Sequence, residues 1–465
     1  MEKLIKNQKY DVEITDTNNL GYGVCKINGC AVFVKNCVQG DKCTVKIIKV
    51  LKNYAIGVCD ELKEASAFRT SPECEYKRCG GCVFQHISFE YENELKKRYI
   101  ESALKKAGLS DITVEDTLYA DNKTSHYRNK AQYPLTKDKD GNIKAGFFAQ
   151  KTHEVIPCDD CAISSRIFSD IVRTSVEFFQ KNGFTVYDEK TGKGLLRHIY
   201  LRCAESTGQV MVCIVINGDT LPKKDEYISC LTDKFPSVRT VCININKENT
   251  NVILSKKTFV LYGDGYIEDT LMGKRFIISP ASFYQVNKRC TEILYAKAKE
   301  LLGNDYKCVL DLYCGIGTVG ICIASDAEKL VGVEIVPEAI EDAKKNAKLN
   351  SLENCNFYNA DASDIAKIAP DADCIIVDPP RKGITREVID YIVKASPEKV
   401  VYISCDPDTL IRDIALFAPL GYVTDKITPV NMFPRTEHVE TVILLSRKDV
   451  HERINFDVNV EDLIK

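Results

Sequence analysis

The sequence predicts an α/β fold in three parts: a small β-barrel, a second β-rich segment, and a Rossmann-like domain with a parallel sheet. Short strand-like runs separated by glycines fill residues 1–64. Residues 65–265 combine a cysteine-rich loop, a charged helix and further strand-like runs, whereas strands alternate with helices throughout residues 266–465. A chain of 465 residues has room for about three domains, each with its own core.

Composition and charge exclude several classes of protein. Hydrophobic residues make up 45% and charged residues 28%, as in globular proteins, and no stretch approaches the ~18 consecutive apolar residues of a membrane span. The lysines near Met1 are not followed by the apolar core of a secretory leader, so we expect a cytoplasmic protein. Residues 1–265 carry 39 basic and 34 acidic side chains, against 24 and 32 in residues 266–465. This small positive excess slightly favours a polyanionic partner.

The barrel is predicted from runs that alternate apolar and polar side chains, at residues 10–14, 30–34 and 42–48. Such short runs with glycines between them are typical of a small antiparallel barrel. Residues 1–60 hold nine lysines and six acidic residues, which suits a surface facing phosphates and equally suits ordinary solvated strands.

The second part begins with a charged helix over residues 91–107, which Gly108 should end as its C-cap. Residues 210–216 and 241–245 have the length and composition of strands. Within residues 123–130, lysine and arginine are interleaved with a tyrosine, a pattern that fits phosphate and base contacts but also fits a plain polar loop.

A glycine-rich loop is the first sign of a ligand site. A strand over residues 307–314 leads into a helix that begins with Gly315, Gly317 and Gly320, and glycines let a backbone approach a ligand closely. A second strand ends in Glu334, nineteen residues past Gly315, at a separation that suits hydrogen bonds from ribose hydroxyls. The pattern predicts an adenosine-containing ligand and does not separate a dinucleotide from S-adenosylmethionine.

Further chemistry-bearing residues follow later strands of the same predicted sheet. One strand ends in Asp378, two prolines and Arg381, which form a rigid lip. The next strand ends at Cys405, and Glu440 directly precedes another. Because the carboxyl ends of parallel strands form the ligand crevice, Cys405 is a candidate nucleophile and Glu440 a candidate base.

The 21 cysteines are an odd number and, in a reducing compartment, do not indicate a disulfide framework, so we expect most to be buried thiols. Cys74, Cys79 and Cys82 are too closely spaced to be explained as chance core packing. They predict a metal centre that is completed by Cys158 or Cys161. Two interpretations of the spacing remain. Cys79 and Cys82 with Cys158 and Cys161 would form a zinc site, whereas all three clustered cysteines plus a distant one suit an iron–sulfur cluster.

Five motifs together resemble the RNA uracil-5-methyltransferases, most closely the branch that acts on 23S ribosomal RNA. The motifs are SFYQVN at 282–287, DLYCGIG at 311–317, DPPR at 378–381, SCDP at 404–407 and FPRTEHVE at 433–440. The barrel resembles the OB-like TRAM domain of that family, so the resemblance covers nearly the whole chain. It implies a class I S-adenosylmethionine-dependent methyltransferase domain over residues 266–465, behind a TRAM domain and an iron–sulfur domain.

The resemblance also implies roles for individual residues. Cys405 would add to carbon 6 of a uridine and Glu440 would remove the proton from carbon 5 after methyl transfer. The implied cofactor site is lined by Gln285, Tyr313, Gly315, Glu334, Asp361 and Asp378, with Glu334 on the ribose and Asp361 near the adenine. Because the target base must leave its stack, the implied partner is 23S ribosomal RNA with an accessible uridine, free or in an assembling particle.

For the metal centre the resemblance implies a four-iron four-sulfur cluster held by Cys74, Cys79, Cys82 and Cys161. Four residues separate Cys74 from Cys79 where the family has five, and that spacing also fits a two-iron cluster. Two other functions stay open: a tRNA uracil-5-methyltransferase, which the barrel and the cysteines disfavour, and a non-catalytic iron–sulfur RNA-binding protein, which Cys405 and Glu440 disfavour.

Overall fold

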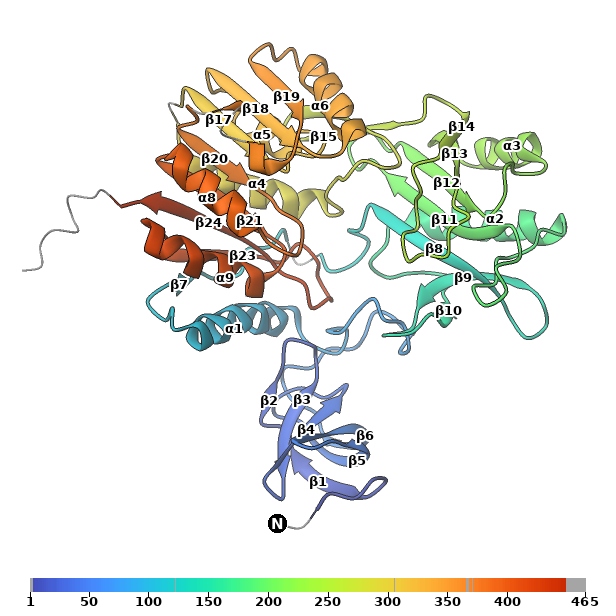
Figure 1. Ribbon diagram of the computed structural model, residues 1–465. Helices are drawn as coiled ribbons and strands as arrows, with labels where there is room; N and C mark the ends of the chain where they lie inside the picture. The colour runs from blue at the N-terminus through green and yellow to red at the C-terminus, as the bar shows by residue number, and fades with distance from the viewer. Residues whose placement is uncertain (1–2, 122, 305, 365–367, 370, 449–465) are drawn as a thin grey trace, which may run out of the picture.

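The computed structural model describes residues 3–121, 123–304, 306–364, 368–369 and 371–448. These residues form three bodies (Figure 1): the barrel in blue at the bottom, a central sheet in green on the right, and a C-terminal sheet in orange and red on the left. Among them, no helix has both the length and the apolar character needed to cross a membrane.

The barrel contains six strands in the order β1-β5-β6-β4-β3-β2. They are β1 (Lys9–Glu13), β2 (Asp16–Thr17), β3 (Gly23–Ile27), β4 (Cys30–Lys35), β5 (Lys42–Val50) and β6 (Tyr54–Glu64). Inward residues such as Val32, Val34 and Val45 are fully buried, as the alternation predicts. The pairing is not antiparallel throughout, because β6 pairs antiparallel with β5 on one side and parallel with β4 on the other.

The central sheet has seven strands in the order β10-β9-β8-β11-β12-β13-β14. They are β8 (Lys130–Lys137), β9 (Ile143–Phe148), β10 (Val155–Pro157), β11 (Leu196–Cys203), β12 (Val210–Ile216), β13 (Val238–Ile245) and β14 (Thr258–Tyr262). Two helices, α2 (Arg166–Lys181) and α3 (Lys224–Lys234), pack their apolar sides on it through residues such as Phe179 and Tyr227. The two runs predicted as strands are the centre of this sheet, β12 and β13, which pair in parallel.

The C-terminal sheet follows the order β19-β18-β17-β20-β21-β24-β23-β7, with β22 beside β24. Its strands are β17 (Cys308–Leu312), β18 (Lys329–Glu334), β19 (Cys355–Asn359), β20 (Cys374–Val377), β21 (Lys399–Ser404), β22 (Tyr422–Val423), β23 (Lys426–Val430) and β24 (Glu440–Arg447). β17 to β21 pair in parallel, and β24 inserts antiparallel between β21 and β23. The chain order reverses between β17 and β20, the place where open α/β sheets bind ligands.

Helices cover both faces of this sheet, which confirms the predicted Rossmann-like domain. They are α4 (Lys288–Leu302), α5 (Thr318–Ile323), α6 (Pro337–Leu349), α8 (Arg386–Ala395) and α9 (Pro407–Phe417), with short turns η1 (Ala362–Asp364) and η2 (Ala418–Leu420). Val309 and Val401 face one core, and their chain neighbours Leu310 and Val400 face the other. Strands buried on both sides therefore explain the continuous apolar runs.

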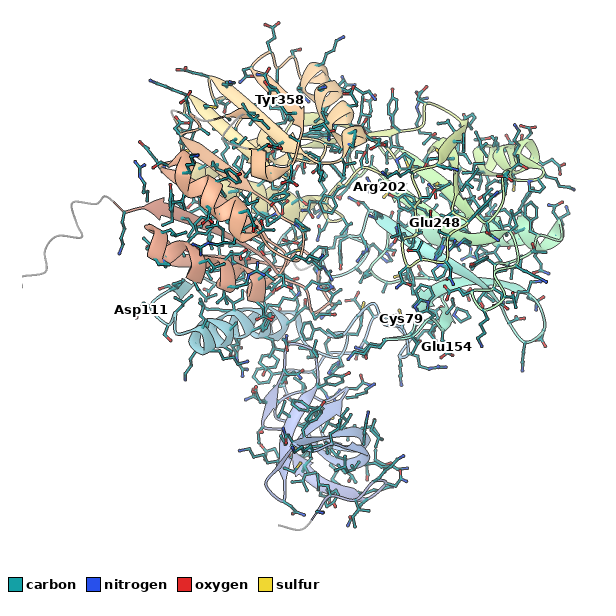
Figure 2. The ribbon with its side chains drawn as sticks, in the orientation of Figure 1. Cys79, Asp111, Glu154, Arg202, Glu248 and Tyr358 are labelled. Carbon is teal, nitrogen blue, oxygen red and sulfur yellow. The ribbon has the colours of Figure 1, made fainter. Side chains whose placement is uncertain are left out.

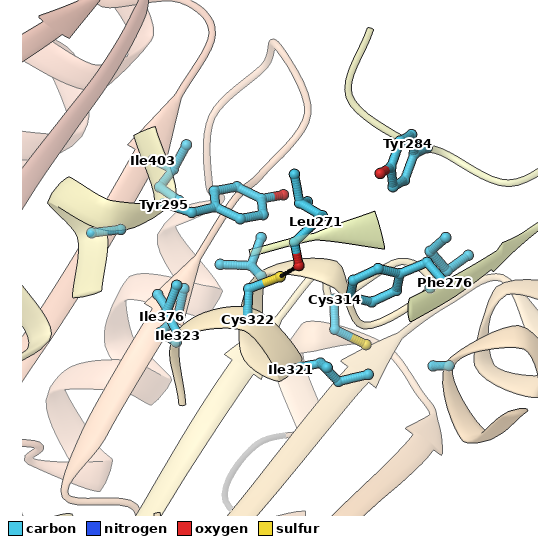
Figure 3. Packing of buried hydrophobic residues seen from close by; sticks show 14 of the residues in the cluster. Leu271, Phe276, Tyr284, Tyr295, Cys314, Ile321, Cys322, Ile323, Ile376 and Ile403 are labelled. Atoms are coloured by element: carbon cyan, nitrogen blue, oxygen red, sulfur yellow. Dashed lines mark hydrogen bonds between the residues drawn. The ribbon is translucent and has the colours of Figure 1, made fainter. Parts of the chain in front are cut away.

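A hairpin of β15 (Ile267–Leu271) and β16 (Lys274–Ile278) packs on the edge of the first core. Figure 3 shows Leu271 and Phe276 of the hairpin beside Ile321 and Cys322 of α5. The Cys322 thiol donates to the Leu271 carbonyl over 3.6 Å. The hairpin thus closes the space behind the helix that follows the glycine loop.

The segment after the barrel packs against the C-terminal domain. Helix α1 (Phe89–Ala107) begins at Ser88, whose side chain accepts from the Tyr91 N–H, and ends at Gly108 with φ of 74°, as predicted. Its residues Ile100 and Leu104 lie in the same core as α8 and α9. The short strand β7 (Thr113–Val114) then pairs with β23 at the edge of the C-terminal sheet (Figure 1).

A buried charged network joins α1 to the loop before Glu440. The Lys96 ammonium donates to Glu92 Oε1 at 3.0 Å, to Asn431 Oδ1 at 2.6 Å and to the Phe433 carbonyl at 3.2 Å. The Asn431 amide and the Arg435 N–H also donate to Glu92 Oε1, both at 2.9 Å. Glu92 is 0% exposed and Lys96 is 2% exposed, so solvent does not screen this network.

Replacing Glu92 with Gln should lower the free energy of unfolding by about 3 kcal/mol, because it leaves the ammonium of Lys96 buried without its carboxylate partner. Chemical and thermal unfolding measure this loss. Glu90→Gln removes an exposed carboxylate from the same helix and should leave the midpoints unchanged. Equal stability of the two variants would contradict the assigned role of the Glu92 carboxylate.

Candidate active site

The glycine loop adopts the tight conformation that the sequence predicts. After β17, Tyr313, Gly315 and Gly317 all have positive φ, at 63°, 55° and 82°. A Cβ added to Gly315 would meet nothing within 4 Å, which leaves open space in front of the loop. At Gly320 an added Cβ would lie 2.7 Å from a carboxylate oxygen of Asp311, so this glycine lets α5 pack closely on β17.

Three predicted cofactor residues gather around this loop. Glu334, at the end of β18, accepts from the Gly315 N–H over 3.3 Å and from the Val336 N–H over 2.9 Å. Burial, followed by the charges of Asp361 and then Glu334, raises the pKa of Tyr313 to about 12, so the three side chains lie within electrostatic reach of one another. Asp361 itself is exposed beyond the end of β19.

An apolar surface beside Glu334 was not predicted from the sequence. Ile335, Val336 and Tyr358 are 64%, 45% and 43% exposed, which is unusual for such side chains. Tyr358 lies on β19 at the upper edge of the domain (Figure 2). These residues offer a flat apolar face next to the ribose-binding candidate. In the sequence, the apolar pair Ile335 and Val336 directly after a strand end could have indicated this surface. The same pair fits the start of a helix equally well.

Two buried carboxyl groups lie below the same crevice. Burial raises the pKa of Asp311 to about 8 and that of Asp378 to about 7. One oxygen of Asp311 accepts from the Gly320 N–H at 2.9 Å, and the other is buried without a hydrogen-bond partner among the described residues. Asp311 was missed as a candidate because an acid inside a strand has no sequence signature of its own.

The loop that carries Gln285 is held from both sides. The Asn129 amide donates to the Gln285 carbonyl at 3.0 Å, and Arg202 donates to the Ser282 carbonyl at 2.9 Å. Arg202 stands at the end of β11 where the central sheet meets the C-terminal domain (Figure 2). At the other end of the loop, the Asn287 amide donates to the Met432 carbonyl at 2.9 Å. The central sheet therefore sets the position of Gln285, which is itself buried.

Cys405 and Glu440 meet across two neighbouring strands. In the antiparallel pair β21 and β24, Ser404 lies opposite Thr441, and the Thr441 hydroxyl donates to the Ser404 carbonyl at 3.0 Å. The next positions outward are Cys405 on one strand and Glu440 on the other. Asp406 then caps α9 by accepting from the Thr409 N–H at 3.1 Å, which fixes the turn that follows Cys405.

The environment of this pair holds both groups in their protonated forms. Burial, then the charges of Glu440 and Asp378, raises the pKa of Cys405 to about 11. Burial and Asp378 raise the pKa of Glu440 to about 8. The exposed guanidinium of Arg381 acts to lower the pKa of both Cys405 and Glu440. Its Nη2 atom lies 3.3 Å from Nε2 of His438. The predicted nucleophile, base and lip therefore share one electrostatic site.

The loop before Glu440 is also tied to the cysteine-rich segment. Arg435 has a positive φ of 71°, and its carbonyl accepts from the N–H groups of Val83 and Phe84 at 2.9 Å and 3.1 Å. Its guanidinium donates to the Ile87 carbonyl at 2.8 Å. Because Val83 directly follows Cys82, the predicted metal centre adjoins a residue that holds the loop before Glu440 in place.

Of the two interpretations of residues 123–130, a contact of the tyrosine ring with an RNA base does not fit the structure, because the ring is covered by protein. The ring of Tyr127 is 6% exposed, and its hydroxyl donates to the Pro434 carbonyl at 2.9 Å. Lys130 is largely covered as well, and burial lowers its pKa to about 7. This segment supports the Arg435 loop because tertiary packing turns its aromatic side chain inward.

The clustered cysteines line one cavity of about 490 Å³ between the barrel and the central sheet. The thiols are those of Cys74, Cys79, Cys82, Cys158 and Cys161, and Figure 2 labels Cys79 beside Glu154. The cationic side chains of Arg69, Lys77, Arg128 and Lys130 line the same space. A hydrogen bond from the Cys158 thiol lowers the pKa of Cys161 to about 6, whereas burial raises that of Cys82 to about 12.

These thiols are spread around the cavity. Over the described ranges, three potential metal-ligating atoms approach within 4.8 Å of one another only at Cys37, Cys43 and Cys59 in the barrel. Sulfurs around one tetrahedral zinc ion would stand about 3.8 Å apart, given zinc–sulfur bonds of roughly 2.3 Å. All 21 cysteines are free thiols; ten are buried and the others half-buried, so fewer are fully buried than predicted.

Two family models match the chain. The model described as TRAM domain matches residues 3–59, and the model described as tRNA (Uracil-5-)-methyltransferase matches residues 90–448. An uncharacterized RNA methyltransferase of Clostridium acetobutylicum is 41% identical over 463 residues, covering 97% of this chain and 100% of that protein. One from Bacillus cereus is 41% identical over 451 residues, covering 95% and 97%.

A solved structure resembles the whole fold. It is the Pyrococcus abyssi tRNA (uracil-54, C5)-methyltransferase in complex with S-adenosyl-L-homocysteine, with a TM-score of 0.76 and 26% identity. The match covers 94% of this chain and 100% of that one. Because a family model spans most of the chain and the relatives match it almost from end to end, the chain belongs to the RNA uracil-5-methyltransferase family and carries a TRAM domain.

Proposed function

We propose that the chain transfers a methyl group from S-adenosylmethionine to carbon 5 of a uridine in 23S ribosomal RNA, in the cytoplasm. The observation that supports this best is the juxtaposition of Cys405 and Glu440 at neighbouring strand ends, on the edge of the sheet that also carries the glycine loop. A thiol and a carboxyl group side by side are the two groups that this reaction requires.

The residues around the glycine loop fit S-adenosylmethionine. Glu334 holds the ribose hydroxyls, and the exposed apolar face of Ile335 and Tyr358 receives the adenine next to Asp361. Gly315 leaves open space for the amino-acid part, and Tyr313 and Gln285 are the side chains that we propose to contact it. The cofactor supplies its methyl group on a positively charged sulfur, and Asp311 and Asp378 provide carboxyl groups near that charge.

In the reaction, the Cys405 thiolate forms a bond to carbon 6 of the uracil ring. The ring becomes an enolate, and its electron-rich carbon 5 accepts the methyl group. Glu440 then takes the proton from carbon 5, the ring double bond re-forms and the bond to Cys405 breaks. Each residue acts only after losing its own proton, Cys405 as the nucleophile and Glu440 as the base, and Arg381 offsets part of the cost that burial imposes.

A tRNA substrate is the second candidate. The Pyrococcus abyssi tRNA enzyme aligns with 94% of this chain, so its match extends into the barrel. The barrel therefore does not separate the two kinds of substrate, contrary to the expectation from sequence. The 23S assignment rests on the motifs and the cysteine-rich segment, and methylation assays with both RNAs distinguish the two candidates.

The cysteine cavity fits an iron–sulfur cluster bound by Cys74, Cys79, Cys82 and Cys161. A cavity of about 490 Å³ with dispersed thiols suits a group larger than one ion, and the surrounding cations offset the negative charge of thiolate ligands. We assign the cluster a structural role, because the segment after Cys82 supports the Arg435 loop. A zinc site that uses Cys158 in place of Cys74 is the alternative.

Protein purified without oxygen should contain iron and acid-labile sulfide, four of each for a four-iron cluster and two for a two-iron cluster. Cys161→Ser should lose both, because it removes a thiolate ligand. Cys230→Ser changes a half-buried thiol on α3, away from the cavity, and should retain them. A stoichiometric amount of zinc without acid-labile sulfide would overturn the iron–sulfur assignment and support the zinc site instead.

Cys405→Ala should lower methylation by roughly a thousandfold or more, because it removes the nucleophile, while binding of S-adenosylmethionine persists. The measurement uses tritiated cofactor with unmodified 23S and tRNA transcripts, followed by nucleoside analysis for 5-methyluridine. Cys308→Ser, at the opposite end of the sheet, is the matched control and should keep full activity. Label in tRNA alone would overturn the 23S assignment, and undiminished turnover of Cys405→Ala would overturn the mechanism.

Turnover should rise with pH through about 8, because Glu440 is protonated below that pH and a protonated carboxyl group does not accept the carbon-5 proton. Arg381 lowers the pKa of Glu440, so Arg381→Gln should shift the rise to higher pH. Lys382→Gln removes the neighbouring exposed charge and should leave the profile in place.

Glu440→Gln supplies the linked control for this assignment. It has no ionisable group at this position, so methylated RNA should remain covalently attached to Cys405 at every pH, as denaturing gels would reveal. Clean product release by Glu440→Gln, or a wild-type profile flat across pH 8, would remove Glu440 from its role.

A further inference from the structure

We propose that Cys37, Cys43 and Cys59 of the TRAM barrel form a binding site for one soft, thiophilic metal ion, separate from the cysteine cavity. Their sulfur atoms all lie within 4.8 Å of one another, and the sulfurs of Cys37 and Cys43 are 3.8 Å apart. Three sulfurs at bonds of roughly 2.3 Å from one ion in a trigonal plane stand about 4.0 Å apart, so only small shifts are needed.

The fold brings the three thiols together from separate elements. Cys59 on β6 lies opposite Val45 of β5. Cys43 lies two residues before Val45 on the same strand, so both side chains are on the inward face of the barrel. The pairing register shifts on both sides of Cys43, and such bulges redirect side chains. Cys37 follows β4 and packs against Gly23, where an added Cβ would lie 2.8 Å from the Cys37 Cβ. The space for this thiol therefore depends on a glycine.

The donor set selects the class of ion. Thiolates without oxygen or nitrogen ligands favour Cu(I) and Zn(II) over harder ions. The nearby Asp41 does not complete a fourth position, because both its oxygens accept from backbone N–H groups and from Arg69, at 2.7–3.0 Å. The His86 ring faces the Cys37 carbonyl instead, at 3.4 Å. Structural zinc is almost always four-coordinate, so three thiolates suit Cu(I) better.

Charge and access are compatible with a bound ion. Cys37 and Cys43 are 0% and 1% exposed, whereas Cys59 is half-buried and offers a path from solvent. The Arg69 guanidinium lies within electrostatic reach of Cys37 and Cys59 and is held there by an ion pair with Asp41 at 2.7 Å.

A metal ion here would stabilise a domain whose core is smaller than those of the two larger sheets. The barrel core consists of few side chains, and three of its neighbouring segments meet at the thiols: β5, β6 and the turn after β4. Domains of this size commonly gain stability from a metal or disulfide. An ion at the triad would join these segments without covering the outer surface of the barrel.

The test uses the full chain, reduced and free of oxygen, titrated with Cu(I) and with Zn(II) against a competing chelator. Wild type should bind one Cu(I) with thiolate-to-metal absorption and bind Zn(II) more weakly. The affinity of Cys43→Ser for Cu(I) should fall further than the roughly 10–100-fold that is typical when a residue supporting a metal ligand is removed, because Cys43 is itself a proposed ligand. Cys30→Ser, in the same barrel but outside the triad, should bind as wild type. Cys161→Ser should empty the cysteine cavity and leave this site intact.

Circular dichroism accompanies each titration, and the half-buried Cys59→Ser replaces Cys43→Ser if the latter does not fold. Equal metal binding by wild type and a folded triad variant would overturn the proposal. Tighter binding of Zn(II) than of Cu(I) would overturn the trigonal coordination. A disulfide bond between Cys37 and Cys43 in the protein as purified without oxygen would also contradict the proposal, because neither sulfur could then bind a metal ion as a thiolate.

Discussion

The buried carboxylate of Glu92 is the interaction on which the arrangement of the whole molecule depends. It accepts from Lys96 on its own helix and from Asn431 and the Arg435 backbone on the loop that leads to Glu440. The same loop receives backbone hydrogen bonds from Val83 and Phe84 of the cysteine-rich segment. One fully buried anion therefore ties helix α1 to the loop before Glu440, which also contacts the cysteine-rich segment, and the contacts of Glu92 with this loop join residues 339 and 343 positions apart in sequence.

The chemistry of the site follows from strand register more than from individual side chains. Pairing of Ser404 with Thr441 leaves Cys405 and Glu440 as the next outward positions, so a slip of β24 by one residue would turn Glu440 to the face opposite Cys405. Burial within the sheet then favours the protonated forms of Cys405 and Glu440, because it is the largest cause of both raised pKa values. Arg381, held on a rigid proline lip, is an exposed charge that acts on both groups.

Local patterns were sufficient to predict most of the C-terminal fold and the strand ends at which the candidate site residues lie. Strand alternation placed Glu334, Asp378 and Cys405 at strand ends correctly, because parallel strands share one carboxyl edge. Non-local pairing was not predictable from such patterns. The parallel ladder between β4 and β6, the burial of Tyr127 and the meeting of Cys37 with Cys59 all depend on which distant segments pack together. Periodicity along one segment carries no information about that choice.

The pairing of β7 with β23 has a consequence for biosynthesis. Helix α1 and β7 leave the ribosome long before the strands they pack against, since Lys96 and its partner Asn431 are 335 residues apart. At about 5–20 residues per second, translation of that interval takes on the order of 17 to 67 seconds. Throughout that time the apolar side of α1, with Ile100 and Leu104, has no native partner in the C-terminal core. The nascent chain therefore exposes this apolar side to solvent until the C-terminal segments that cover it have been made.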